Sequence, residues 1–194
     1  LPLIMDKQGL NKPFSSRRDI VFVGGYQHSP NVDAVKFLTM EVLPRVQQKL
    51  GPIQVTIVGS NATAEIFDLQ SDSVKVVGWV DDLLPYYNSH KMVVAPLRFG
   101  AGVKGKIGEA LSHGIPTVTT SVGVEGMPLI NGQDILFADT ADEIADAVVK
   151  VYNDEQLWTS LSHNGQRKID SLVGNDALRK MVDDLLDQVS SLKA

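Results

Sequence analysis

The sequence predicts an α/β domain: a doubly wound, Rossmann-like parallel sheet of about six strands, flanked by helices and followed by a helical C-terminal tail. Three observations predict this class. Short continuous apolar runs recur along the chain, and the first three end in glycine, which is typical of strands buried on both faces. Segments with apolar residues at helical spacing separate these runs, and only helical patterns follow residue 140.

The strands are expected where the apolar runs fall, at residues 20–23, 55–58, 74–77, 92–95, 117–119 and 135–138. Gly24, Gly59 and Gly78 follow the first three of these runs. Because strands and helices alternate, the crossovers should be right-handed and the strands parallel. The carboxyl ends of the strands should then share one edge of the sheet, where ligands bind in this class.

The helices are expected between and after the strands. Ser29 supplies a capping hydroxyl and Pro30 a first helical residue for a helix that Gly51 ends. Further helices are predicted at residues 62–69, 83–87, 107–111, 141–152, 155–169 and 177–193.

The composition is that of one ordinary globular domain, with 194 residues, 43% hydrophobic and 21% charged. Residues 1–19 lack periodicity and contain Pro2, Gly9 and Pro13, which is typical of a linker. The expected division is therefore a linker remnant at 1–19 and a domain at 20–194. Because the chain begins with Leu1-Pro2, we expect it to be a piece of a longer protein.

The net charge of −5 argues against a nucleic-acid partner, because binding to a phosphate backbone needs a wide basic face. Any anionic ligand should be small. The absence of cysteine removes disulfides and cysteine metal sites, and it favours a reducing compartment, most simply the cytoplasm. No run approaches the roughly 20 apolar residues of a membrane span, so no transmembrane segment is expected.

The stretch 96–118 contains a glycine-rich, cationic loop that leads into a helix. Between residues 83 and 108 there is no Asp or Glu, yet four cations fall there: Lys91, Arg98, Lys104 and Lys106. The glycines free backbone N–H groups and the helix N-terminus is positive, so this loop predicts a phosphate site. Ile107 follows Gly105-Lys106, which departs from the P-loop pattern. A solvated basic loop is the structural alternative.

Glu109 lies in an otherwise apolar part of that helix. A carboxylate there can accept two hydrogen bonds from a vicinal diol, as acidic residues do when they bind a ribose. The alternative from spacing alone is an ion pair with Lys106, three residues earlier.

Several other residues have two interpretations. His28 is a candidate phosphate contact, while His113, at the end of a helix, reads as structural. Trp79 and Tyr86 either stack on a base or pack in the core, and Glu125 is a loop carboxylate that faces the ligand edge. No carboxylate pair indicates glycoside hydrolysis and no His/Asp cluster indicates a metal site.

From residue 20 onward, the chain resembles the C-terminal, nucleotide-sugar-binding domain of group 1 (family 4) retaining glycosyltransferases of GT-B fold. The motifs that carry the resemblance are FVGG (22–25), SPNVDA (29–34), VGWV (77–80), GAGVKGK (100–106) with Glu109, GIPTV (114–118) and SVGVEG (121–126). Residues 1–19 resemble the linker between the two halves of such enzymes.

The resemblance implies a set of site residues. Glu109 matches the second glutamate of the family's Glu-x7-Glu pattern, which binds the ribose, while the first glutamate falls on Ala101. The Arg and Lys that many members carry after the first strand are missing here, so Lys104 and Arg98, together with Lys106, are the candidates that would stabilise the leaving diphosphate, with Lys104 and Arg98 as catalytic residues. The donor-binding residues would be Gly24, Gly25, Gly59, Val80, Ala101, Gly102, Val103, Lys106 and Glu109.

The function implied is transfer of a sugar from a nucleoside diphosphate sugar to an acceptor, without a metal or other cofactor. The acceptor site and any association with a membrane would belong to the missing N-terminal half, so this chain should be inactive alone. Two alternatives stay open: a non-catalytic nucleotide-sugar-binding or interaction module, which Ala101 favours, and an enzyme of the same fold such as a sugar-nucleotide epimerase.

Overall fold

The computed structural model describes residues 12–173. The expected helix at 177–193 and most of the expected linker lie outside the described residues.

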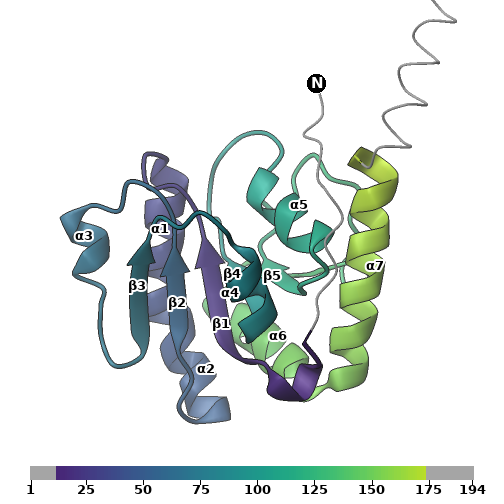
Figure 1. Cartoon of the computed structure of the whole chain (residues 1–194), viewed down its shortest axis with the longest axis horizontal. Helices are drawn as coiled ribbons and strands as arrows, with labels where there is room; N and C mark the ends of the chain where they lie inside the picture. Colours follow the sequence, from purple (N-terminus) through teal and green to yellow (C-terminus); the bar gives the residue numbers. More distant parts are fainter. Residues whose placement is uncertain (1–11, 174–194) are drawn as a thin grey trace, which may run out of the picture.

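Six parallel strands form one sheet, in the order β3-β2-β1-β4-β5-β6. Figure 1 labels the strands from β3 to β5 in this order. The strands are β1 Arg18–Val23, β2 Val55–Val58, β3 Val74–Gly78, β4 His90–Ala95, β5 Thr117–Thr119 and β6 Leu136–Phe137. This is the doubly wound order, and its direction reverses between β1 and β4. The predicted fold class is confirmed.

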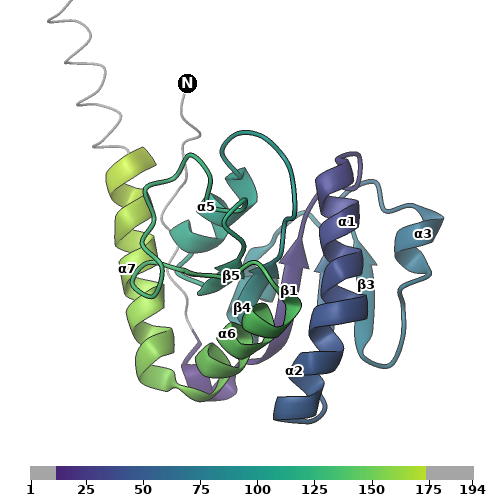
Figure 2. The ribbon, with the colours of Figure 1, turned by 180° about the vertical axis from the view of Figure 1, so that it is seen from behind.

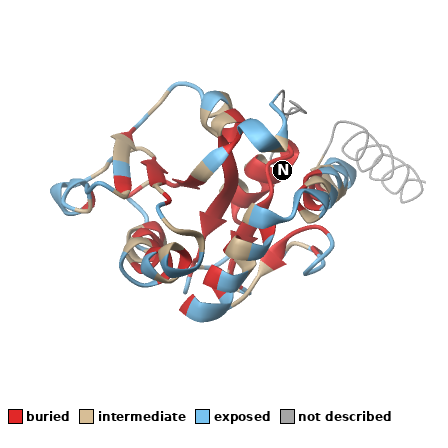
Figure 3. Ribbon diagram, turned by 90° about the horizontal axis from the view of Figure 1, so that it is seen from below, coloured by how far each residue is buried: buried red, intermediate tan, exposed pale blue. Residues whose placement is uncertain are grey.

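The centre of the sheet is the most deeply buried part of the domain. Every residue of β4 is buried, and Ile20 of β1 lies opposite Met92 of β4 and Val55 of β2. Figure 3 shows buried strands between helices whose outer sides are exposed. Because both faces of these strands are covered, their sequences are continuous apolar runs rather than alternating ones.

The helices cover both faces of the sheet. Their bounds are α1 Ser29–Phe37, η2 Leu38–Val42, α2 Leu43–Leu50, α3 Ala64–Phe67, α4 Leu84–Ser89, α5 Gly105–Ser112, α6 Ala141–Asn153 and α7 Glu155–Val173. Figure 2 shows α1, α2 and α6 on one face, and Figure 1 shows α4 on the other. α5 and α7 pack against each other.

The helix expected to run from residue 29 to Gly51 is continuous, but its centre, η2, is a π-helix. In this π-helix, Leu43 N–H bonds to Leu38 O, five residues earlier. The next residue, Pro44, has no N–H with which to form the usual bond to the carbonyl four residues earlier. The capping role expected for Ser29 is wrong, because His28 is the N-cap residue and no side chain caps this end. Ser29 and Pro30 both lie in the first turn.

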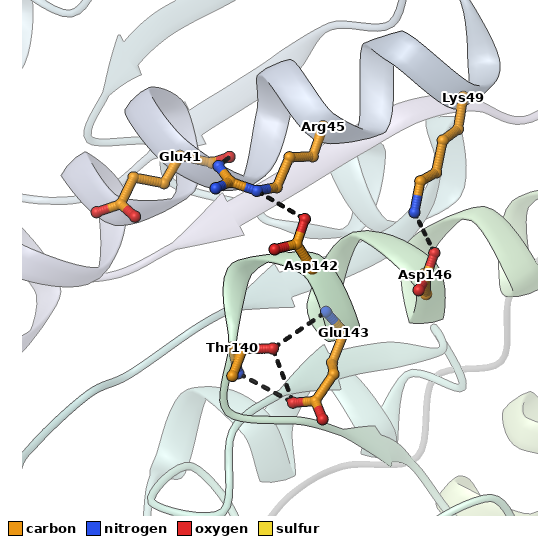
Figure 4. A network of polar contacts seen from close by, with 7 residues as sticks. All are labelled: Glu41, Arg45, Lys49, Thr140, Asp142, Glu143 and Asp146. Carbon is orange, nitrogen blue, oxygen red and sulfur yellow. Dashed lines mark hydrogen bonds and ion pairs between the residues drawn. The ribbon is translucent and has the colours of Figure 1, made fainter.

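Helix α6 begins with a capping box and is joined to α2 by ion pairs (Figure 4). Thr140 Oγ1 accepts a hydrogen bond from Glu143 N–H, and the Glu143 carboxylate accepts one from Thr140 N–H. The ion pairs are Arg45–Asp142 and Lys49–Asp146. Exposed pairs of this kind contribute little to stability.

The segment before β1 packs on the domain rather than lying free. Arg17 is 1% exposed, and its Nη1 donates to Tyr87 O at 2.5 Å and His90 O at 3.2 Å. A short 3-10 turn, η1 Phe14–Ser16, places the Phe14 ring 5.9 Å from that of Trp158 on α7. Residues 14–17 therefore pack on the sheet and on α7, and β1 starts two residues earlier than expected.

Candidate functional site

A cavity of about 680 Å³ opens at the carboxyl edge of the sheet, next to the reversal point between β1 and β4. The ends of β1, β2 and β3 and the loop from β4 to α5 form its walls. The predicted site residues that line it are Gly24, Gly25, Gly59, Val80, Ala101, Val103, Lys104, Lys106 and Glu109. Arg98 and Gly102 do not line it.

Glycines allow the ends of β1 and β2 to approach each other under the cavity. A Cβ atom on Gly59 would lie 1.7 Å from Gly24 O, so no larger residue fits there without moving backbone. Gly24 N–H donates to Val58 O at 3.0 Å and Gly59 N–H to Gly78 O at 2.8 Å, which extends the ladder to the cavity floor. Ligand atoms can therefore approach this backbone closely.

Lys106 is a cation without a counter-ion. It lies in the first turn of α5 and crosses to α1, where its Nζ donates to Asn31 Oδ1. The Nζ also lies 5.5 Å from the centre of the Phe22 ring. Burial, together with the nearby charge of Lys104, lowers the pKa of Lys106 to about 8. No carboxylate among residues 12–173 pairs with it, so an anionic ligand would supply the missing charge.

Lys104 closes the glycine loop on itself. Its side chain is 9% exposed, and its Nζ donates to Gly100 O at 3.1 Å and Gly102 O at 2.5 Å. The Glu125 carboxylate lies 3.6 Å away. Positive φ angles of 128° at Gly100 and 77° at Gly102 let both carbonyls turn toward the ammonium. Lys104 thus shapes the cavity wall and brings positive charge to it.

Glu109 presents a carboxylate that has no hydrogen bond or ion pair with any described side chain. It is half-buried on the cavity side of α5, and burial raises its pKa, which the nearby His113 partly offsets. The alternative ion pair with Lys106 does not form, because Lys106 turns toward Asn31. The carboxylate is therefore available to a ligand.

The structure does not bring Arg98 to the cavity. Its guanidinium binds the carboxylate of Asp33 through two hydrogen bonds, of 2.9 and 2.5 Å, and lies 4.7 Å from the centre of the Phe37 ring. This pair holds the pKa of Asp33 below its usual range. Gly102 also lies outside the lining, where its carbonyl binds Lys104.

The cavity includes residues that sequence reasoning missed or left open. Trp79 is 66% exposed at its edge, so the core-packing alternative does not hold for this residue, whereas Tyr86 is half-buried and stacks on His90. Asn31 was missed, because an asparagine in the first turn of a helix is an ordinary helix-start signal. Other lining residues are His28, Pro30, Ser60, Leu83 and Leu97.

Within residues 12–173, no three His, Asp or Glu side chains gather in a way that could hold a metal ion. None of the helices in this part of the chain is long and apolar enough to cross a membrane.

The strand order and the place of the cavity define a Rossmann-like domain with its site at the reversal point of the sheet. Residues 17–154 match the model of a family described as glycosyl transferases group 1. The chain belongs to that family.

The chain is also similar in sequence or structure to individual known proteins. The capsular polysaccharide biosynthesis glycosyltransferase CapM of Staphylococcus aureus is 26% identical over an alignment of 129 residues that covers 61% of this chain and 33% of CapM. S. aureus TarM, in a complex with UDP, has a TM-score of 0.75 at 16% identity, over 93% of this chain and 38% of TarM. The C-terminal domain of a group 1 glycosyl transferase, LpcC of Francisella tularensis, has a TM-score of 0.63 at 15% identity.

The fraction of each known protein that this chain covers differs. This chain covers 87% of the LpcC domain, with 82% of its own length aligned, but only about a third of the length of CapM.

Proposed function

We propose that this chain is the donor-binding half of a retaining glycosyltransferase, which transfers a sugar from a nucleoside diphosphate sugar to an acceptor. One observation carries the proposal: a single cavity holds both a cation, Lys106, and a carboxylate, Glu109, and neither has an oppositely charged partner among residues 12–173. A nucleoside diphosphate needs both, because its diphosphate is anionic and its ribose offers two hydroxyl donors.

The two charges define the orientation of the donor. The diphosphate would lie over Gly24-Gly25, against Lys106 and the N-terminus of α5, and the ribose hydroxyls would bind Glu109. The base would lie toward Val80 at the end of β3, and the sugar toward the loop at Ala101.

This orientation explains how the chain would assist the reaction. When the bond between sugar and diphosphate breaks, negative charge grows on the leaving phosphate. Lys106 and the positive end of α5 would stabilise that charge, and Lys104 would add positive potential from the loop wall. The proposed chemistry therefore uses side chains and helix backbone, without a metal ion.

The acceptor would be bound by a second domain. The chain covers about a third of CapM and most of the separately solved C-terminal domain of LpcC, which supports its assignment as one half of a larger enzyme. Groups that position the acceptor would come from the N-terminal half. We therefore expect the isolated chain to bind donor without turning it over.

A non-catalytic nucleotide-sugar-binding module is the second candidate, and Ala101 favours it. Ala101 is exposed at the cavity wall, where a carboxylate would otherwise contact the sugar. Sugar transfer by the chain joined to its N-terminal half would exclude this candidate.

Calorimetric titration of the purified chain with UDP, GDP, ADP and dTDP tests the proposal. We expect one of these to bind, and Lys106→Met and Glu109→Gln each to weaken its binding by about tenfold or more. Lys49→Met is a matched control, because Lys49 lies on α2 outside the cavity and pairs with Asp146. Absence of binding to all four nucleotides would contradict the donor site, and sugar transfer by the isolated chain would contradict its dependence on a second domain.

A further inference from the structure

Asn31 connects three parts of the cavity wall. It is 6% exposed in the first turn of α1. Its Nδ2 donates to Gly25 O at 2.7 Å, and its Oδ1 accepts from Lys106 Nζ, in a helix 75 residues away in the chain. A single side chain thus ties the loop after β1 and the start of α1 to the cation of α5.

The chemistry of the two contacts requires an amide. Gly25 O can only accept a hydrogen bond, and the Lys106 ammonium can only donate. The NH₂ end of Asn31 must therefore face Gly25, and this fixes the carbonyl end toward Lys106. A carboxylate of the same shape would lose the bond to Gly25 O and neutralise Lys106, while an aliphatic residue would make neither contact.

The hydrogen bond from Lys106 to Asn31 limits where the Lys106 charge can lie. A lysine has a long flexible stem, so a free ammonium would lose considerable side-chain entropy on binding an anion. The charged and titratable groups around it are Lys104 in the preceding loop, Glu109 on the same helix and His28 in the loop after β1. None of these holds the ammonium, and within residues 12–173 Asn31 is the hydrogen-bond acceptor that fixes it beside the backbone of Gly25, over the Phe22 ring.

We propose that Asn31 is a positioning residue, which orients Lys106 toward the diphosphate of the donor while joining the loop after β1 to helix α5. This inference rests on the proposed function. Asn31 acts through Lys106, and the ammonium is pre-placed before the ligand arrives. Such pre-organisation strengthens binding because less side-chain freedom is lost in the complex.

A double-mutant cycle read by titration with UDP, or with whichever of the four nucleotides binds, tests this role. Asn31→Ala should weaken binding about tenfold in the natural chain, but less than about twofold in a Lys106→Met background, because the residue that it positions is then gone. An equal loss in both backgrounds, or no loss in the natural chain, would overturn the proposal.

Two further variants separate positioning from packing. Asn31→Asp keeps the shape of the side chain, and it should weaken binding more than Asn31→Ala while raising the pKa of Lys106, read by NMR of its ¹³C-labelled ε-carbon. Asn131→Ala is a matched control, because Asn131 also bridges two backbone groups, both on Phe137, outside the cavity. It should leave nucleotide binding unchanged, and a loss like that of Asn31→Ala would count against the proposal.

The outcomes distinguish a failure of the proposed function from a failure of the role of Asn31. If the natural chain binds no nucleotide, the proposed function fails. If it binds but tolerates Asn31→Ala and Asn31→Asp in folded protein, as judged by thermal melting, only the role of Asn31 fails.

Discussion

Lys106→Met should stabilise the fold while it weakens ligand binding. Lys106 holds a positive charge in a partly buried place, with no counter-ion among residues 12–173. In the protein without ligand, this charge therefore lowers the free energy of unfolding. Methionine has a similar length and no charge. It keeps the apolar contact with Phe22 and leaves Asn31 Oδ1 at the cavity, where water can reach it.

The magnitude follows from the lysine pKa, which falls from its ordinary value of 10.5 to about 8. A fall of about 2.5 pH units at about 1.4 kcal/mol each corresponds to about 3.5 kcal/mol for the buried charge. Loss of the hydrogen bond to Asn31 offsets about 1 kcal/mol of this. The free energy of unfolding of Lys106→Met should therefore rise by about 2.5 kcal/mol at pH 7, or roughly 5 to 10 °C in melting temperature.

Urea denaturation of both proteins between pH 7 and pH 10 is the assay. Above about pH 8, folded Lys106 loses its proton while the unfolded lysine keeps it, so the stability of the natural chain rises with pH up to about 10.5. The advantage of Lys106→Met should therefore shrink as the pH rises. A variant that is less stable than the natural chain at pH 7, or an advantage that does not change with pH, would refute the reasoning.

Three further predictions follow. Glu109→Gln should abolish the preference, of about tenfold or more, for UDP over its 2′,3′-dideoxy analogue; in the natural chain, binding should weaken as pH falls through the raised pKa of Glu109. Gly59→Ala should lower the free energy of unfolding by about 2 kcal/mol or more in urea, whereas Gly25→Ala, whose Cβ would meet only Ser60 Oγ at 3.2 Å, should cost less. In urea denaturation, Lys91→Met should lose only the share of the rise in stability between about pH 8 and 10 that comes from burial of Lys91, whose pKa is about 8, and it should keep the share of Lys106.

The sheet was predictable because most of its strands contain a short apolar run between turn signals. The burial of Arg17, just before β1, and of His90 and Lys91 at the start of β4 was not, since these residues are polar yet buried. Their burial depends on distant partners: Arg17 binds the carbonyls of Tyr87 and His90, His90 Nε2 lies 2.8 Å from Thr56 Oγ1, and Lys91 Nζ donates to Phe14 O at 2.7 Å. Local patterns do not contain this information.

The location of the candidate site was predictable from the glycines and cations at one sheet edge. The partner of each charge was not. Spacing allowed an ion pair between Lys106 and Glu109. In the folded chain, Lys106 instead donates to Asn31, 75 residues away, and Arg98 donates to Asp33, 65 residues away. A contact between distant segments outweighs a neighbour on the same helix when it fixes the side chain in a buried place. The roles assigned to the site residues stay predictions.

A crystal structure of the chain with the nucleoside diphosphate that binds most tightly would test the central claim most directly. The account predicts phosphate oxygens within hydrogen-bond distance of Lys106 Nζ and of the first backbone N–H groups of α5, with both ribose hydroxyls on Glu109. A nucleotide bound outside the cavity, or one whose ribose lies away from Glu109, would contradict it.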